Sequence, residues 1–191
     1  MATVATHLIT AEEFYEWANR PEHEDQCFEL VRGEIVEMPP PGKFHGFVCG
    51  NIARLLGNYA YARRKGYVCT NDAGVIVERD PDTVRGPDLT FYDDTKNAAT
   101  MERQFAVAPP TLAVEVLSPH DRPNRMVQRV AQLLQRGVGC VWLVDPETRD
   151  VTVHRSNQKP LLLEAHQELD GGETLPSFRC HVAEFFATPG E

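Results

Sequence analysis

The 191-residue sequence lacks the features of a membrane or secreted protein. No run of about 18 apolar residues is present, which excludes a transmembrane helix of the usual length. Residues 1–10 lack a charged segment followed by a signal-type apolar stretch. We therefore expect a cytoplasmic protein without membrane partners, and the length predicts a single domain over residues 1–191.

Cysteine pairs at the spacing of a disulfide framework or a zinc site are also missing. The chain has five cysteines, an odd number, and no Cys-x-x-Cys motif; they lie at positions 27, 49, 69, 140 and 180. This scatter predicts reduced, mostly buried thiols.

An excess of positive charge is absent as well. The formal net charge is −9, which argues against nucleic-acid binding because duplex affinity comes largely from cationic contacts to phosphate. The basic residues are nevertheless grouped, at residues 63–65 and at Arg122, Arg125, Arg129 and Arg136. We interpret this grouping as a local basic rim for DNA, with Arg122 and Arg125 as substrate-binding residues.

Several catalytic signatures do not occur in the sequence. It has no P-loop, no Gly-x-Ser-x-Gly elbow, no His-Glu-x-x-His pair and no Gly-x-Gly-x-x-Gly turn. It has neither a helix-turn-helix signature nor a zinc knuckle, so no DNA-specific module is evident.

The apolar patterning predicts three helices and a series of strands. Thr10 and Glu13 form a capping-box pattern for a short helix that ends near residue 21, and residues 27–38 indicate a hairpin turning at positions 32–33. Longer helices are expected at 44–65, ended by Gly66, and at 125–136, between Asn124 and Gly137. One or two strands are expected within 67–77, and further strands at 89–92, 111–117 and 141–144, with an edge strand at 151–154 that residues 161–163 could join.

The passage from strand 112–117 through a helix to strand 141–144 is a crossover unit, which implies a parallel strand pair. The remaining strands have the spacing of hairpins. Together they predict an α/β (α+β-like) fold, with a mixed sheet flanked by helices and an N-terminal hairpin.

Two acidic residues stand in apolar surroundings. Glu115 lies in the middle of the strand Leu-Ala-Val-Glu-Val-Leu, and Asp88 follows Pro87 at the start of another strand. A buried carboxylate must be neutralised, paired or bound to a metal. If the two strands are adjacent, the carboxylates can share Mg²⁺ or Mn²⁺. The alternative is a Pro-Asp turn and a strand glutamate paired with an arginine.

Five segments carry a resemblance to a known family. They are residues 28–34 (Phe-Glu-Leu-Val-Arg-Gly-Glu), His45, residues 86–89 (Gly-Pro-Asp-Leu), residues 112–119 (Leu-Ala-Val-Glu-Val-Leu-Ser-Pro) and residues 137–146 (Gly-Val-Gly-Cys-Val-Trp-Leu-Val-Asp-Pro). In this order and spacing the chain resembles the Uma-type, restriction-endonuclease-like branch of the bacterial PD-(D/E)XK nucleases, over a core of about residues 8–187.

The resemblance implies a restriction-endonuclease-like core and a homodimer. Asp88 and Glu115 match the residues that bind one or two divalent ions in the superfamily, and the backbone carbonyl of Val116 or Leu117 could add a ligand. Exposed aromatic side chains would permit the dimer; the candidates are Trp142, Phe185, Phe186 and the stretch 59–61.

The catalytic lysine of the superfamily pattern is missing. It is expected two residues after Glu115, where this chain has Leu117, and the position on the next helix that lines up with the family lysine is Arg129. Arginine remains protonated, so it can neutralise a phosphate or hold a water but cannot act as a base. Alternatively, Arg129 belongs to a solvated face with Arg125, Gln132 and Arg136.

Two further residues are additional site candidates. Glu29 lies between apolar neighbours in the hairpin and matches a third carboxylate, although a glutamate on the open face of the hairpin fits the pattern equally well. His45 begins the long helix and could bind metal or phosphate or transfer a proton; a capping or solvated histidine is the alternative.

Three functions are compatible with these residues. The first is a metal-dependent endonuclease that acts on DNA, with Asp88, Glu115 and Arg129 as catalytic residues. The second is a catalytically degenerate protein that keeps the fold for binding nucleic acid or protein, which the missing lysine and the net charge of −9 favour. The third is a hydrolase of a smaller phosphate ester.

Overall fold

A mixed six-stranded sheet forms the centre of the molecule. The computed structural model describes residues 8–119 and 121–190. The strand order of the sheet is β10-β9-β8-β7-β6-β3. Its strands are β3 (Tyr67–Thr70), β6 (Leu89–Tyr92), β7 (Leu112–Val116), β8 (Cys140–Asp145), β9 (Asp150–His154) and β10 (Leu161–Glu164). Among these, β7 and β8 pair in parallel and the other neighbours are antiparallel.

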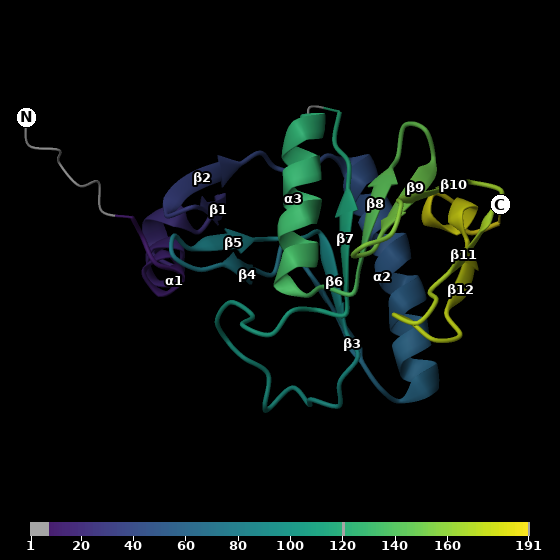
Figure 1. Cartoon of the computed structure of the whole chain (residues 1–191), viewed down its shortest axis with the longest axis horizontal. Helices are drawn as coiled ribbons and strands as arrows, with labels where there is room; N and C mark the ends of the chain where they lie inside the picture. The colour runs from purple at the N-terminus through teal and green to yellow at the C-terminus, as the bar shows by residue number, and fades with distance from the viewer. Residues whose placement is uncertain (1–7, 120, 191) are drawn as a thin grey trace, which may run out of the picture.

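Two helices cover opposite faces of this sheet, as Figure 1 shows. They are α2 (Lys43–Arg63) and α3 (Pro123–Arg136). Alternate residues of β7 point to opposite faces, so Leu112, Val114 and Val116 lie in the apolar cluster of α2 whereas Ala113 lies in that of α3. β7 is therefore buried along its whole length.

A second sheet, with strand order β2-β1-β5-β4, lies beside the first (Figure 1). It contains β1 (Cys27–Val31), β2 (Glu34–Met38), β4 (Val75–Glu78) and β5 (Thr83–Arg85), and α1 (Ala11–Ala18) and the short helix η1 (Pro21–His23) precede it. Phe14 of α1 packs on Leu30 and Val84 in its core. Residues 86–88 connect β5 directly to β6 of the central sheet, so this link joins the two sheets.

The C-terminal segment completes the core on the α2 side. It consists of a third, two-stranded sheet of β11 (Glu168–Asp170) and β12 (Arg179–His181), followed by η2 (Val182–Phe185). Trp142, Phe185 and Phe186 are at most 5% exposed and belong to the core cluster of α2. The expectation that they form a dimer surface is wrong, because they close this core; of the residues proposed, Tyr61 is the one that stands out, 88% exposed.

The predicted elements of the fold are largely confirmed. The capping box of Thr10 and Glu13 opens α1, the hairpin turns at Arg32 and Gly33, and β7, α3 and β8 form the parallel crossover unit. The α/β fold with a mixed sheet between helices is the predicted class. No helix in the described part of the chain combines the length and apolar character needed to cross a bilayer.

Three element boundaries differ from the sequence-based expectation. Helix α2 ends earlier, because Arg64 rather than Gly66 takes the left-handed cap conformation. Helix α3 begins with Pro123 at its first position, where the missing N–H costs nothing, so Asn124 lies inside the helix and not at its cap. Strand β9 is not an edge strand, because β10 pairs with it on the side away from β8; the expected pairing of residues 161–163 with this strand is confirmed.

The end of α2 is tied to the end of β6 by Asp93. Its carboxylate accepts from Arg63 Nη1 at 2.9 Å and from Lys65 Nζ at 3.1 Å. Burial alone would raise the pKa of Asp93, but the two cations outweigh it and hold the pKa below its ordinary value. We predict that Asp93→Asn lowers the free energy of unfolding by about 1 kcal/mol at pH 7.

Because the pKa of Asp93 is lower in the folded state, its contribution is complete above the unfolded-state pKa of about 3.9 and is lost as the pH falls further. Urea unfolding of both proteins between pH 7 and pH 3 should show the difference shrinking below about pH 4. Exposed Asp25→Asn serves as the control. A difference that stays constant down to pH 3 would show that the charge of Asp93 contributes nothing.

Candidate functional site

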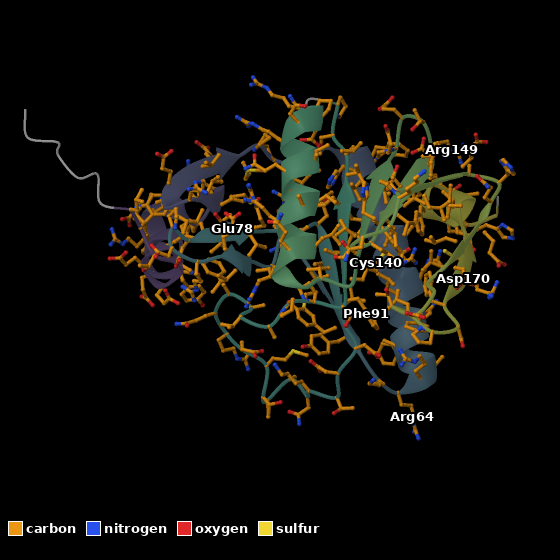
Figure 2. The ribbon with its side chains drawn as sticks, viewed as in Figure 1. Arg64, Glu78, Phe91, Cys140, Arg149 and Asp170 are labelled. Atoms are coloured by element: carbon orange, nitrogen blue, oxygen red, sulfur yellow. The ribbon has the colours of Figure 1, made fainter. Side chains whose placement is uncertain are left out.

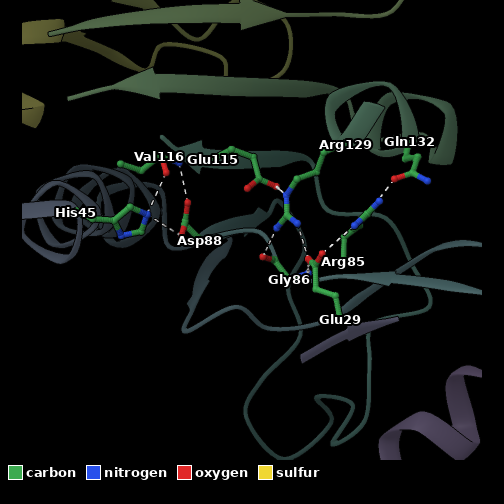
Figure 3. A network of polar contacts seen from close by, with 9 residues as sticks. All are labelled: Glu29, His45, Arg85, Gly86, Asp88, Glu115, Val116, Arg129 and Gln132. Carbon is green, nitrogen blue, oxygen red and sulfur yellow. Dashed lines mark hydrogen bonds and ion pairs between the residues drawn. The ribbon is translucent and has the colours of Figure 1, made fainter. Parts of the chain in front are cut away.

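Polar side chains from five separate elements meet where the two sheets join. Figure 3 shows them: His45 from α2, Glu29 from β1, Glu115 from β7 and Arg129 from α3 surround the link that carries Asp88. Glycine is needed in this link at Gly86, because a Cβ there would lie 2.6 Å from the carbonyl oxygen of Asp72.

Arg129 lies at the centre of one half of this cluster. Its Nε donates to Glu115 Oε1 at 2.8 Å, its Nη1 to Glu29 Oε1 at 2.5 Å, and its Nη2 to the carbonyl oxygen of Gly86 at 2.6 Å. The residue is only 8% exposed. A guanidinium has five N–H donors in a fixed plane, which allows it to bind three elements at once.

Glu29 holds the other side of Arg129. Its carboxylate accepts from Arg85 Nη1 at 2.8 Å and from the backbone N–H of Gly86 at 2.8 Å. Arg85 Nε in turn donates to Gln132 Oε1 at 2.9 Å, one turn along α3 from Arg129. All four side chains are buried, and the network satisfies charges that would otherwise be costly to bury.

The second half of the cluster is built on Asp88. Its Oδ2 accepts from the backbone N–H of Val116 at 2.7 Å, while its Oδ1 lies 3.2 Å from His45 Nε2. The same nitrogen lies 3.0 Å from the carbonyl oxygen of Val116, and Nδ1 of the ring lies 3.6 Å from Cys49 Sγ. Asp88 therefore joins the link 86–88 to both β7 and α2.

The charges in this site shift one another's protonation. Burial raises the pKa of Glu115, Arg129 opposes this rise, and the charge of Asp88 adds to it. Burial disfavours the charged form of Arg129, but Glu115 and Glu29 outweigh it and raise its pKa. The hydrogen bond that His45 donates to Asp88, followed by its hydrogen bond with Cys49, raises the pKa of His45 to about 10.

Most of the residues predicted from sequence come together here. Asp88, Glu115, Arg129, Glu29 and His45 all belong to the cluster (Figure 3). Glu115 does pair with an arginine, as the alternative interpretation expected, and that arginine is the site candidate Arg129. The expectation that Arg129 shares a solvated face is wrong, because this residue is buried against the two glutamates.

The basic rim is only partly present. Arg122 is the N-cap of α3 and Arg125 lies in its first turn. Both are exposed, and they lie about two turns and about one turn from Arg129, respectively. Residues 63–65 are different: they lie about 27 Å from His45 along α2, at a rise of 1.5 Å per residue. Figure 2 shows Arg64 projecting from that far end, and Arg63 and Lys65 pair with Asp93.

The comparisons with known proteins agree with this architecture. A family model described as "Uma2: Putative restriction endonuclease" matches residues 11–183. The chain belongs to the Uma2 family.

A solved structure has the same fold as this Uma2 protein. It is described as the crystal structure of a putative nuclease belonging to DUF820 from Anabaena variabilis ATCC 29413. The two chains are 18% identical, with a TM-score of 0.78 over 93% of this chain and 97% of the other. The search of curated proteins gave no match. The predicted family resemblance and nuclease-like fold are thus confirmed.

Three members of the Uma2 site were not predicted from sequence. Arg85 and Gln132 carry no motif. Arg85 ends β5, a strand of three residues that the sequence pattern did not indicate, and Gln132 on the expected helix α3 accepts its hydrogen bond. Cys49 lies one helical turn after His45, a spacing that places both on the same face of α2. Of the three residues, Cys49 alone could have been found from sequence, by its i, i+4 spacing from His45.

The buried network predicts an unequal response to substitution at Arg129. Arg129→Met leaves Glu29 and Glu115 without their shared cation, so we expect the free energy of unfolding to fall by about 3–5 kcal/mol. Arg129→Lys should lose less, because one ammonium keeps the charge but reaches fewer acceptors. Urea unfolding at pH 7 measures both.

The matched control for Arg129→Met is Arg54→Met, at an exposed position of α2, which should change stability by less than about 0.5 kcal/mol. If Arg129→Met costs no more than this control, the guanidinium does not hold the two glutamates as described.

Proposed function

We propose that this Uma2 protein hydrolyses phosphodiester bonds in DNA, using a divalent cation held by Asp88 and Glu115. The observation that carries the proposal is that Asp88, immediately before β6, and Glu115, in the adjacent strand β7, interact electrostatically beside the buried guanidinium of Arg129, which pairs with Glu115. Its support from the comparisons is the family match over residues 11–183.

The donor set fits Mg²⁺ or Mn²⁺, which prefer oxygen ligands. Asp88 Oδ1 and the carbonyl oxygen of Val116 already converge, since both lie within 3.2 Å of one atom, His45 Nε2. Glu115 precedes Val116 in β7, and the negative charge of Asp88 raises the pKa of Glu115. A divalent cation at these oxygens would stabilise the negative charge that develops on the scissile phosphate.

The chain's own residues orient this donor set. The N–H of Val116 holds Asp88 Oδ2, which fixes the direction of Oδ1. Arg129 holds Glu115 Oε1 and keeps two N–H groups beyond its three hydrogen bonds, which can attract a phosphate. Arg122 and Arg125 extend positive charge from Arg129 to the surface.

A second function is favoured by a specific observation. Leu117 occupies the position of the family lysine, and Arg129, which stands nearest to that role, is committed to Glu29 and Glu115. A protein with this site could bind nucleic acid or metal without cleaving. The cleavage experiment separates the two functions.

Cleavage of supercoiled plasmid in Mg²⁺ or Mn²⁺ tests the catalytic proposal. We expect the wild-type protein to cleave only with added metal, and Asp88→Asn and Glu115→Gln each to lose at least about 100-fold in rate, because each removes a charged ligand. Both replacements keep the size of the side chain, and circular dichroism checks that the variants fold.

Glu34→Gln, an exposed change on β2, is the matched control and should cleave like the wild type. Metal binding without cleavage of double- or single-stranded DNA would support the non-catalytic function. Wild-type cleavage that persists in EDTA would contradict the metal-dependent proposal.

Substitution of Arg122 and Arg125 tests the DNA surface. The double variant Arg122→Ala/Arg125→Ala should bind DNA of any sequence more weakly, and the slope of log K against log salt should become shallower by about 2, or about 1 per lost phosphate contact. Fluorescence anisotropy at several salt concentrations measures it. The control Arg20→Ala/Arg54→Ala removes two exposed arginines outside the cluster; an equal effect there would indicate non-specific attraction.

A further inference from the structure

The imidazole of His45 faces two oxygen atoms with one nitrogen. Its Nε2 lies 3.2 Å from Asp88 Oδ1 and 3.0 Å from the carbonyl oxygen of Val116 (Figure 3). This nitrogen carries either one proton or one lone pair, so a single N–H cannot point well at both acceptors. A positive group placed between the three atoms would satisfy all of them.

The surrounding contacts fix the orientation of these atoms. Asp88 Oδ2 is held by the N–H of Val116 at 2.7 Å, which directs Oδ1 toward His45. The opposite nitrogen of the ring, Nδ1, lies 3.6 Å from Cys49 Sγ. The ring is thus held at both ends, with Nε2 directed at the oxygens.

The spacing matches that of donors around one small cation. Two ligands at right angles, each about 2.1 Å from an ion, lie about 3.0 Å apart, close to both distances from Nε2. In the described part of the chain, His45, Cys49 and Asp88 form the one group of at least three metal-binding side chains whose donor atoms lie within 4.8 Å of one another.

We propose that His45 Nε2 is a nitrogen ligand of the cation, together with Asp88 Oδ1 and the Val116 carbonyl, and that it selects Mn²⁺ or Co²⁺ over Mg²⁺. Imidazole binds transition-metal ions well, whereas Mg²⁺ takes oxygen ligands and keeps its waters. A cation that binds here displaces the proton of Nε2. Cys49 then acts from outside, because Nδ1–H donates to its sulfur and fixes the tautomer whose Nε2 lone pair faces the cation. This inference rests on the proposed function in taking Asp88 as a metal ligand.

Calorimetric titration of the full chain with Mg²⁺, Mn²⁺ and Co²⁺ tests it without any measurement of cleavage. The wild type should bind Mn²⁺ and Co²⁺ at least tenfold more tightly than Mg²⁺. His45→Ala should weaken Mn²⁺ and Co²⁺ by about 10- to 100-fold and change Mg²⁺ by less than about threefold. Cys49→Ser, whose hydroxyl still accepts from Nδ1, should lose less than His45→Ala.

Spectra of the wild type test the assignment even if His45→Ala does not fold. The imidazole ¹⁵N resonance of His45 Nε2 should shift on addition of Zn²⁺, and the Co²⁺ complex should show no thiolate charge-transfer band. A band would make Cys49 a direct ligand and overturn the arrangement, as would an unshifted Nε2 resonance.

Failure of this inference is distinguishable from failure of the proposed function. If His45→Ala binds all three ions like the wild type while Asp88→Asn and Glu115→Gln lose Mg²⁺, the ligand role of His45 is overturned and the nuclease proposal stands. If His45→Ala weakens Mg²⁺ as much as Mn²⁺, the selectivity is overturned. If no ion binds to the wild type, both proposals fall.

Discussion

One buried guanidinium, that of Arg129, connects the parts of the molecule that make the site. It joins α3 to β7 through Glu115, to the second sheet through Glu29, and to the link between the sheets through Gly86. Removing Arg129, Glu29 or Glu115 alone would leave a buried charge without a partner. The free-energy cost of such a charge exceeds the stabilisation that the intact ion pair provides. The two sheets, the crossing helix and the acidic residues are therefore positioned by one set of contacts.

This constraint explains why the site lies at the sheet junction. The short link 86–88 passes from β5 into β6, and its backbone is held on both sides, by Glu29 at the N–H of Gly86 and by Arg129 at its carbonyl. Asp88 follows at once and is held by the N–H of Val116. A short loop with fixed hydrogen bonds places a carboxylate more precisely than a long one, because fewer dihedral angles are free.

Local patterns predicted the fold and the pair of acids, but not the contacts between them. The apolar strand around Glu115 and the crossover helix were visible in sequence because burial imposes periods of 2 and 3.6 residues. The helix period also made Arg129 look solvent-exposed. Its partner Glu29 is 100 residues earlier in the chain, and no local pattern contains that separation. The role of Arg85 was not predicted for the same reason, since its partner Glu29 lies 56 residues away in the chain.

The two halves of the site differ in what their cations can do. An arginine has no lone pair to offer, so Arg129 can balance Glu29 and Glu115 but can never bind an ion. Histidine can either carry a positive charge or bind an ion through its lone pair, and His45 lies against Asp88 and the Val116 carbonyl. The Arg129 half thus keeps a fixed charge whether or not a metal is present, while the His45 half can change its partner. The charge of Asp88 raises the pKa of Glu115, so a cation bound at Asp88 would act electrostatically on the carboxylate that Arg129 holds in place.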